Sequence, residues 1–292
     1  MKPSDLLAAL LVVLIWGFNF VAIKVGLQGL PPVLFTGLRF LFAALPVVFF
    51  VRRPAIPWRL LAGYAGFQFA GQFTLLFYGM KLGFPAGLAS LVIQLQAFFT
   101  IGLAILFLGE RPLLLQLCGA LIAFAGMGLV ASQLGAGSTM VGFALVIVAG
   151  LSWAVGNIFT KRIGKVDPLA LVAWGSLLAT PPLFAASLLL EGPQAIGTAL
   201  LGMGWLSTAA LLFQSYAATI LGYGIWSHLI RTYPAAAVAP FTLLVPVSGM
   251  VSAALALGEP LQWWKLAAGA LVMCGLALNQ LGPRLLARYA AK

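Results

Sequence analysis

Charged residues are scarce in this sequence. Only 7% of its 292 residues are Asp, Glu, Lys or Arg, whereas 63% are hydrophobic. A water-soluble domain needs far more charge than this to cover its surface. The shortage of charge therefore excludes an ordinary soluble fold and predicts an all-α integral membrane protein.

Acidic and catalytic side chains are rarer still. The single histidine, His228, lies near the end of an apolar run, and no carboxylate pair, Ser-His-Asp triad or metal-binding cluster can be assembled from the chain. This argues against a membrane-embedded enzyme and against a proton antiporter that uses a buried carboxylate. We expect no catalytic residues, no metal and no cofactor. The five acids all lie at the ends of apolar runs or in connections: Asp5, Glu110, Asp167, Glu191 and Glu259.

Cysteine is also sparse. Cys118 and Cys274 both lie inside apolar segments and lack the spacing of metal ligands. They are therefore interpreted as small buried hydrophobic residues.

Long hydrophobic runs with short connections fill the rest of the chain. About 20 helical residues cross the hydrocarbon core of a bilayer, and breaks such as Arg52-Arg53-Pro54 and Glu259-Pro260 separate the runs. The longest connection is expected near 190–204. We predict ten membrane-spanning helices at 5–25, 33–51, 58–80, 85–108, 112–132, 139–161, 168–189, 205–229, 234–257 and 262–282.

The distribution of positive charge predicts the orientation of the chain in the membrane. The formal net charge is +11, and it gathers at the ends of the apolar runs rather than on a face that could bind nucleic acid. With the N-terminus inside, the cytoplasmic segments hold 12 Lys and Arg residues and the outer segments hold 3. Cytoplasmic connections carry the excess of Lys and Arg. The sequence therefore predicts a multi-pass protein of the bacterial inner membrane with both termini in the cytoplasm.

Identities at fixed offsets indicate an internal repeat. We predict two related units, 1–135 and 136–292, with five helices each. Because five is odd, the second unit must lie in the membrane in the opposite orientation, as in inverted-repeat transporters. The matching residues, at offsets of 137 and then 149, are Trp16/Trp153, Lys24/Lys161, Pro31/Pro168, Gly109-Glu110/Gly258-Glu259 and Gly126/Gly275.

Polar and aromatic side chains deep in the spans are the candidate site residues, because a polar group in hydrocarbon is costly unless it is paired or faces a cavity. Any of them can instead tie helices together, and Tyr78 also fits an interfacial aromatic belt. We interpret Arg39 as structural. The predicted cavity residues are Trp16, Asn19, Gln68, Gln72, Tyr78, Ser90, Gln94, Trp153, Asn157, Tyr216, Tyr223 and Pro246.

Such a wall suits a zwitterionic metabolite. Amide oxygens and aromatic faces can hold an ammonium group, while amide N–H groups and hydroxyls can hold a carboxylate. Arg39, although interpreted as structural, is a further candidate to hold the carboxylate. Because no strong ion pair traps the ligand, the pattern favours transport over tight binding.

Several short motifs together resemble one known family. They are Leu14-Ile15-Trp16-Gly17-Phe18-Asn19-Phe20, Leu38-Arg39-Phe40, Pro85-Ala86-Gly87-Leu88-Ala89-Ser90, Gly109-Glu110-Arg111, Ser152-Trp153-Ala154, Gly222-Tyr223-Gly224-Ile225-Trp226 and Leu243-Leu244-Val245-Pro246-Val247. This set resembles the EamA-type members of the drug/metabolite transporter superfamily, over essentially the whole chain. Within it, the chain is most similar to bacterial exporters of cysteine and O-acetylserine, with the aromatic amino-acid exporters as relatives.

The resemblance implies ten helices in two inverted repeats around a central cavity. Spans 1, 3, 4, 6, 8 and 9 would line the cavity, and spans 5 and 10 would lie at the periphery. It also implies a transporter that exports amino acids and related metabolites by alternating access, with broad specificity. The partners would be a small-molecule substrate and membrane lipid, and the chain is compatible with a monomer. Four-helix relatives use a first-span glutamate for proton antiport, but Trp16 and Asn19 occupy that region here, which favours facilitated export.

Three other functions stay open. An exporter of lipophilic cations would want an anionic or strongly aromatic cavity, and the missing deep acid counts against it. A membrane-embedded enzyme would need a set of acid, base or metal-binding residues that this chain lacks. An inverted repeat with broken helices is more typical of an alternating-access carrier than of a pore. Prolines mark candidate hinges for alternating access: Pro46, Pro85, Pro181, Pro182, Pro240 and Pro246.

Overall fold

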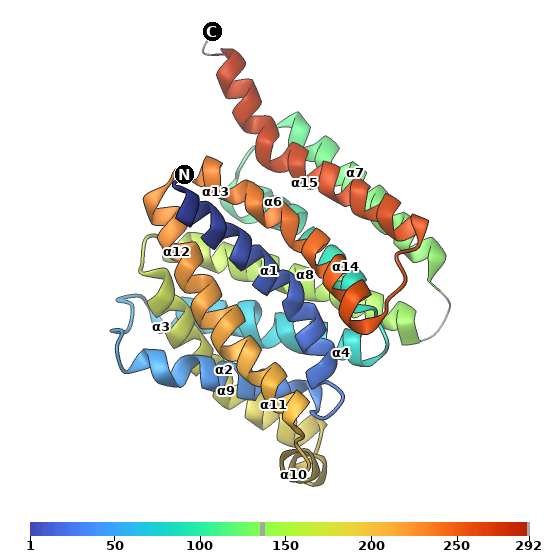
Figure 1. The fold of residues 1–292 in the computed structure, drawn as a ribbon. Coiled ribbons are helices and arrows are strands. Elements are labelled where there is room, and N and C mark those ends of the chain that lie inside the picture. Colours follow the sequence, from blue (N-terminus) through green and yellow to red (C-terminus); the bar gives the residue numbers. More distant parts are fainter. Residues whose placement is uncertain (135–137, 291–292) are drawn as a thin grey trace.

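The computed structural model describes residues 1–134 and 138–290, which form helices and no strands (Figure 1). The first half contains α1 (Pro3–Gly26), α2 (Pro32–Val48), α3 (Trp58–Tyr64), the π-helix η1 (Ala65–Gly71), α4 (Gln72–Lys81), α5 (Ala86–Val92), the 3-10 helix η2 (Ile93–Leu95), α6 (Gln96–Leu108) and α7 (Leu114–Gln133). The second half contains α8 (Ser138–Ile163), α9 (Pro168–Leu190), α10 (Pro193–Leu201), α11 (Trp205–Leu212), the π-helix η3 (Phe213–Leu221), α12 (Gly222–Thr232), α13 (Ala235–Val238), the 3-10 helix η4 (Ala239–Leu243), α14 (Leu244–Leu257) and α15 (Trp263–Ala290).

The predicted all-helical membrane fold is confirmed. Within the described residues, eight continuous helical segments are long and apolar enough to cross a membrane. The segment from α11 to α12 passes this test only together with α10, to which it is bent by 100°. Helix α2, with 17 residues, is slightly too short. The count of ten spans therefore stays a prediction.

Three boundaries differ from the predicted ones. The connection expected near 190–204 contains α10, which begins with a proline at its first position and lies at the lower edge of Figure 1. Proline suits this position, because the first amides of a helix have no partner within the helix. Helix α2 ends at Val48 rather than near residue 51, and α15 continues to Ala290.

Matching turns end two of the helices. Gly109 follows α6 and Gly258 follows α14, and their φ angles are 66° and 68°. This left-handed conformation costs glycine nothing because glycine has no Cβ. Each turn directs the next residue, Glu110 or Glu259, back toward the helix bundle, where both make the contacts described below.

Helices of the two halves alternate in the bundle. Helix α1 packs against α14, α2 against α9, and α8 against α4 and α6 (Figure 1). Helices α7 and α15 lie side by side at one edge. There a Cβ on Gly119 would lie 2.6 Å from the carbonyl oxygen of Gly275, and one on Gly126 would lie 3.1 Å from that of Ala268. Small residues thus let these backbones approach closely, as in many membrane helix pairs.

The outer surface of the bundle is apolar and suited to lipid. Phe50, Leu189, Leu201 and Leu255 are each more than 80% exposed, which would be costly in water. Inside, a phenylalanine cluster that includes Phe35, Phe69 and Phe77 is fully buried. Buried polar side chains, among them Asn19, Arg39, Gln68 and Gln214, lie in the same interior.

Candidate functional site

A polar cavity of about 390 Å³ lies between helices of both halves. Its size falls in the range of small-ligand sites. The polar residues that line it are Asn19, Arg39, Gln68, Gln72, Gln94, Gln96, Asn157, Thr160, Thr242 and Gln280. The aromatic residues that line it are Trp16, Phe20, Tyr64, Phe73, Trp153, Tyr223 and Trp226.

Breaks in regular helix geometry shape the cavity wall. The segment α3–α4 contains the π-helix η1, and α11–α12 contains the π-helix η3. The segments α5–α6 and α13–α14 contain the 3-10 helices η2 and η4. Residues of all four irregular segments line the cavity or lie beside it. π-helical turns are rare and occur often at functional sites.

Side chains from neighbouring helices bond carbonyls of both π-helices. The indole Nε1 of Trp16 donates to the carbonyl oxygen of Ala218 in η3 at 3.0 Å. The hydroxyl of Ser152 on α8 donates to the carbonyl oxygen of Phe67 in η1 at 2.8 Å. Backbone groups in a membrane need partners within the protein. These bonds therefore fix both wide turns and hold α1 and α8 against them.

Aromatic rings form one wall. The ring of Trp16 lies 5.6 Å from that of Tyr223 and 5.4 Å from that of Trp226. The tilted arrangement of these rings is typical of favourable aromatic pairs. Because the Trp16 indole N–H is already bonded to Ala218, the rings present mostly their apolar and π surfaces to a ligand.

Some of the amides in the wall are paired with each other. The Nδ2 of Asn157 donates to Oε1 of Gln96 at 2.9 Å and to Oγ1 of Thr100 at 3.0 Å. Asn157 thus ties α8 to α6, as expected of polar residues between membrane helices. It can still contact a ligand, because both it and Gln96 line the cavity.

Other amides have an oxygen without a partner. Among the described residues, Oδ1 of Asn19 and Oε1 of Gln68, Gln72 and Gln280 are buried and accept no hydrogen bond. All four residues line the cavity. A buried polar atom without a partner costs about 1–3 kcal/mol. Donors on a ligand that reaches these side chains would supply the partners that the four oxygens lack.

The cavity also contains a positive charge. Arg39 is 3% exposed and lines the cavity from α2. Its Nη1 donates to Oε1 of Gln214 at 3.1 Å, and its Nη2 donates to Oγ1 of Thr219 at 3.3 Å. Its guanidinium carbon lies 4.0 Å from the centre of the Phe73 ring, a cation–π contact. Among the described residues, the wall is thus polar and aromatic, with a single cation and no carboxylate.

The cavity extends toward the end of the bundle that holds the N-terminus, the N-side. Thr160, in the last turn of α8, lines the cavity and is exposed. At this end Asp5 lies 3.7 Å from His228, and Asp167 lies 3.9 Å from Arg231. The Tyr233 hydroxyl donates to Asp5 at 2.6 Å, and this bond raises the pKa of Tyr233.

Glu110, which follows the glycine turn after α6, also lies at the N-side. It is exposed, and among the described residues its carboxylate bonds only Lys161, at 2.8 Å.

The opposite end, the far side, is closed. Lys24 Nζ donates to the carbonyl of Met80 at 3.0 Å, and Lys81 Nζ donates to that of Leu27 at 2.7 Å. Leu27, Met80 and Phe84 are almost completely buried there. These contacts hold the ends of α1 and α4 together, with the buried apolar side chains packed at the same end.

Two carboxylates brace the far side. Glu259 accepts the amides of Ala86 at 2.7 Å and Gly87 at 3.0 Å at the start of α5. Glu191 accepts those of Val33 at 2.7 Å and Leu34 at 3.0 Å at the start of α2. A carboxylate at a helix N-terminus is favourable, because the first amides are free and the helix dipole is positive there.

Eight of the twelve predicted cavity residues line the cavity. They are Trp16, Asn19, Gln68, Gln72, Gln94, Trp153, Asn157 and Tyr223. They come from α1, from both π-helical segments, from η2 and from α8.

The other four predicted residues lie elsewhere. Ser90 is fully buried, and its hydroxyl donates to the carbonyls of Gly87 at 2.7 Å and Pro246 at 3.3 Å. Tyr216 is 41% exposed, on the outer face of η3. Tyr78 packs against the core near the far end of α4. Pro246 borders a separate crevice.

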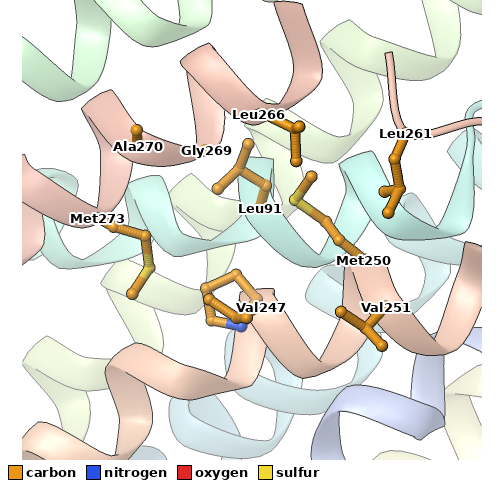
Figure 2. A pocket seen from close by; sticks show the side chains of 10 residues that line it. Leu91, Val247, Met250, Val251, Leu261, Leu266, Gly269, Ala270 and Met273 are labelled. Atoms are coloured by element: carbon orange, nitrogen blue, oxygen red, sulfur yellow. The ribbon is translucent and has the colours of Figure 1, made fainter. Parts of the chain in front are cut away.

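That crevice is apolar and is bordered by α5, α14 and α15 (Figure 2). It measures about 210 Å³, and Figure 2 shows Leu91, Met250, Leu266 and Met273 around it. The described residues of its lining offer hydrocarbon and sulfur but no polar side chain. It is therefore unsuited to a charged or zwitterionic ligand, and the polar cavity is the candidate site.

Several cavity residues are not among the predicted ones. Gln280 and Leu276 lie on α15, the tenth predicted span, which was expected at the periphery. Gln96, Thr160 and Thr242 also line the cavity. Arg39, interpreted from sequence as structural, does so as well. The sequence feature that could have identified Arg39 as a cavity residue was its charge deep within a predicted span.

The predicted hinge prolines have different settings. Pro46 lies inside α2, Pro181 and Pro182 lie inside α9, and Pro246 lies inside α14. Pro240 lies within the 3-10 helix η4. Pro85 is instead the N-cap of α5, where it interrupts no helix. In the described residues, no group of three or more His, Cys, Asp or Glu side chains could hold a metal.

Comparisons with known proteins agree on one family. The model of the EamA-like transporter family matches residues 4–132 and 140–280. A protein of Salmonella typhimurium (strain LT2), named "Probable amino-acid metabolite efflux pump", is 47% identical over 97% of each chain. A protein of Escherichia coli (strain K12) with the same name is 44% identical over 97% of each chain.

More distant relatives extend the picture. A protein of Streptantibioticus cattleyicolor, named "Probable terminal-alkyne amino-acid exporter", is 27% identical and covers 95% of this chain and 94% of its own. A crystal structure of a protein that is 21% identical covers 98% of this chain and 99% of its own, with a TM-score of 0.57. That likeness shows the fold alone.

Proposed function

Because this chain belongs to the EamA-like transporter family, we propose that it exports amino acids and related small metabolites from the cytoplasm across the bacterial inner membrane. The observation that carries this proposal is the cavity of about 390 Å³, whose wall combines amides, aromatic rings and one arginine. Such a wall offers partners for both an ammonium and a carboxylate group. The names of the two relatives above 40% identity support the same substrate class.

Broad specificity fits this wall. The amide oxygens of Asn19, Gln68 and Gln72 and the rings of Trp16 and Tyr223 recognise features that amino acids share. No carboxylate in the described part of the chain lines the cavity, and this also disfavours tight holding of a lipophilic cation. The side chain of the substrate would meet mostly apolar and aromatic surface, which discriminates weakly between ligands.

We infer that the chain forms ten spans in two inverted repeats, 1–135 and 136–292. In support, a π-helix interrupts the third and eighth predicted spans, and a 3-10 helix interrupts the fourth and ninth. The offset of 149 residues relates Gly119 to Ala268 and Gly126 to Gly275. It therefore relates the Gly119–Gly275 contact to the Gly126–Ala268 contact, as a two-fold axis between α7 and α15 would.

The proposed orientation has the N-side in the cytoplasm. The 12 to 3 distribution of Lys and Arg supports it. On this orientation the structure is closed toward the outside, and the cavity extends toward the cytoplasm, from which an exporter loads its substrate.

The two glycine-turn glutamates support transport by alternating access. Glu259 holds the start of α5 on the closed far side, whereas its repeat counterpart Glu110 is exposed on the N-side and pairs with Lys161. In the outward-open state we expect these roles to exchange, with Glu259 released and Glu110 at the start of α13. Two states with such reciprocal contacts are typical of inverted-repeat carriers.

Counterflow in proteoliposomes tests the proposed function. Vesicles that contain the purified protein are loaded with unlabelled threonine, methionine, cysteine or phenylalanine, and uptake of the labelled amino acid is followed with and without a pH gradient. We expect saturable counterflow of at least one of them. We also expect no response to the pH gradient, since none of the described residues that line the cavity is a carboxylate.

A matched pair of variants ties the flux to the cavity. Ala97 lines the cavity, whereas Ala125 is exposed on α7 away from it. Ala97→Trp should abolish counterflow by filling the cavity, and Ala125→Trp should preserve it. Absence of counterflow for all four amino acids with the wild-type protein would withdraw the amino-acid assignment.

A further inference from the structure

Arg39 is a buried cation without a carboxylate partner. The chain has five acidic side chains, and each has its partners elsewhere. Asp5 contacts His228 and Tyr233, Glu110 contacts Lys161, and Asp167 contacts Arg231. Glu191 and Glu259 accept amides at the starts of α2 and α5. Within the described residues, no carboxylate side chain is therefore left for Arg39.

The surroundings of Arg39 only partly replace such an anion. Two neutral acceptors, Gln214 and Thr219, bind its Nη atoms, and the Phe73 ring covers one face. Its Nε has no hydrogen-bond partner among the described residues. Burial of a charge is expensive unless it is paired. A charged residue deep in a membrane protein is accordingly expected to serve a ligand or an ion pathway.

The position of Arg39 indicates where an anionic partner would come from. It borders the same cavity as the free amide oxygens of Asn19 and Gln72. The missing partner is thus an anionic group on a molecule in the cavity, and guanidinium groups bind carboxylates with particular strength through paired N–H donors. We propose that Arg39 binds the α-carboxylate of the transported molecule, while the free amide oxygens accept its ammonium group.

This inference rests on the proposed function and narrows it. It narrows the substrate class to molecules that carry a carboxylate, and it excludes the amines that lack this group. The offset of 137 residues relates Arg39 to Ser176, so the second half of the chain has no equivalent cation. The carboxylate site therefore lies on one side of the cavity only, and the substrate binds in a single orientation.

Matched ligands test the proposal. Phenylalanine, 3-phenylpropionate and phenethylamine differ only in the ammonium or the carboxylate group, and the leucine series (leucine, 4-methylpentanoate and 3-methylbutan-1-amine) gives a second set. Each is used as a competitor of counterflow in proteoliposomes. We expect the wild type to be inhibited about tenfold or more strongly by the carboxylates than by the amines, because a lost buried ion pair weakens binding by at least that factor.

Three variants separate recognition from structure. Arg39→Gln should lose the preference for carboxylates, whereas Arg39→Lys should retain it with weaker affinity. Arg59→Gln, at an exposed position on α3, should behave as the wild type. A merely structural arginine would change expression and thermal stability in Arg39→Gln without changing the ratio of carboxylate to amine inhibition.

Ligand-induced thermal stabilisation of the detergent-solubilised protein provides the second readout. It distinguishes failure of this inference from failure of the proposed function. If amino acids are transported but amines inhibit the wild type as well as carboxylates do, or Arg39→Gln keeps the preference, the Arg39 inference is wrong and the function stands. If no amino acid is transported, stabilisation by 3-phenylpropionate that Arg39→Gln loses supports the carboxylate site alone, and absence of stabilisation by either carboxylate overturns it. Should Arg39→Gln fail to fold, the wild-type competition and Arg39→Lys decide by the same criteria.

Discussion

Single residues around the cavity have two distinct tasks. Trp16 and Ser152 bond carbonyls in the π-helices, and Asn157 ties α8 to α6. Asn19, Gln68 and Gln72 instead keep an oxygen without a partner. The first group holds the shape of the cavity, and the second is available to a ligand. Substitutions in the two groups should therefore have different effects.

Trp16→Phe tests the first task. The change keeps an aromatic ring near Tyr223 and Trp226 but removes the N–H that bonds the Ala218 carbonyl. We expect a loss of about 1 kcal/mol in stability, the contribution of a typical hydrogen bond, with a lowered thermal unfolding temperature and slower transport. Trp205→Phe, at a position that is 76% exposed, serves as the control. Equal unfolding temperatures for Trp16→Phe and the wild type would contradict the role of this bond.

Gln72→Leu tests the second task. The amide oxygen of Gln72 is buried at the cavity without a partner, so its removal relieves an unpaired polar atom. We expect unchanged or raised thermal stability together with a several-fold higher KM for counterflow. A fall in stability with an unchanged KM would place Gln72 among the structural residues instead.

Whole elements meet through small residues and capped helix ends. The α7–α15 pair depends on the close approach at Gly119 and Gly275. The closed far side depends on Glu259 at the start of α5. The first contact is a matter of packing, and the second is one that a carrier would have to break and remake.

Gly119→Ala tests the packing of α7 against α15. The added Cβ would lie 2.6 Å from the Gly275 carbonyl oxygen, so the helices must separate, at a cost of roughly 1–3 kcal/mol. Gly128→Ala on the same helix is the matched control, since its Cβ would meet no atom within 4 Å. There the gain in helix propensity should be neutral or slightly stabilising. Thermal unfolding in one detergent compares them, and equal behaviour of the two variants would contradict this packing.

Glu259→Ala tests the closure of the far side. The change removes both acceptors of the Ala86 and Gly87 amides, so the far side should open more often. A reporter cysteine at Leu27, 3% exposed at that end, is introduced after Cys118 and Cys274 are replaced by alanine. Its labelling by a membrane-impermeant maleimide should become several-fold faster in Glu259→Ala. Glu110→Ala, whose carboxylate bonds Lys161 on the other side, should not accelerate it.

At the scale of the molecule, the all-helical membrane fold could be predicted from the sequence. Apolar runs and breakers such as Arg52-Arg53-Pro54 predict most helix boundaries within a few residues. Helix α10 was missed because a nine-residue helix is too short to leave a spanning signal. Depth within a span, together with the repeat, was sufficient to select Trp16, Trp153 and Asn157, which line the cavity.

The remaining cavity residues depend on geometry that the sequence does not display. Tyr216 was predicted from its depth in a span, but it lies in the π-helix η3 and is 41% exposed, so depth alone does not assign its face. Ser90 satisfies its hydroxyl through α5 and α14 rather than through a ligand. Gln280 lies on a helix whose other residues are mostly apolar, and only the tertiary arrangement brings it to the cavity.

Reciprocal accessibility of the two ends tests alternating access most directly. Reporter cysteines at Thr160 on the N-side and at Leu27 on the far side are labelled separately in nanodiscs, with and without a saturating transported amino acid and in Glu259→Ala. We predict fast labelling at residue 160 and slow labelling at residue 27 in the ligand-free wild type, as the exposure of these residues in the structure indicates. Any condition that accelerates labelling at residue 27 should slow it at residue 160. Simultaneous acceleration at both ends, the behaviour of a pore, would contradict alternating access.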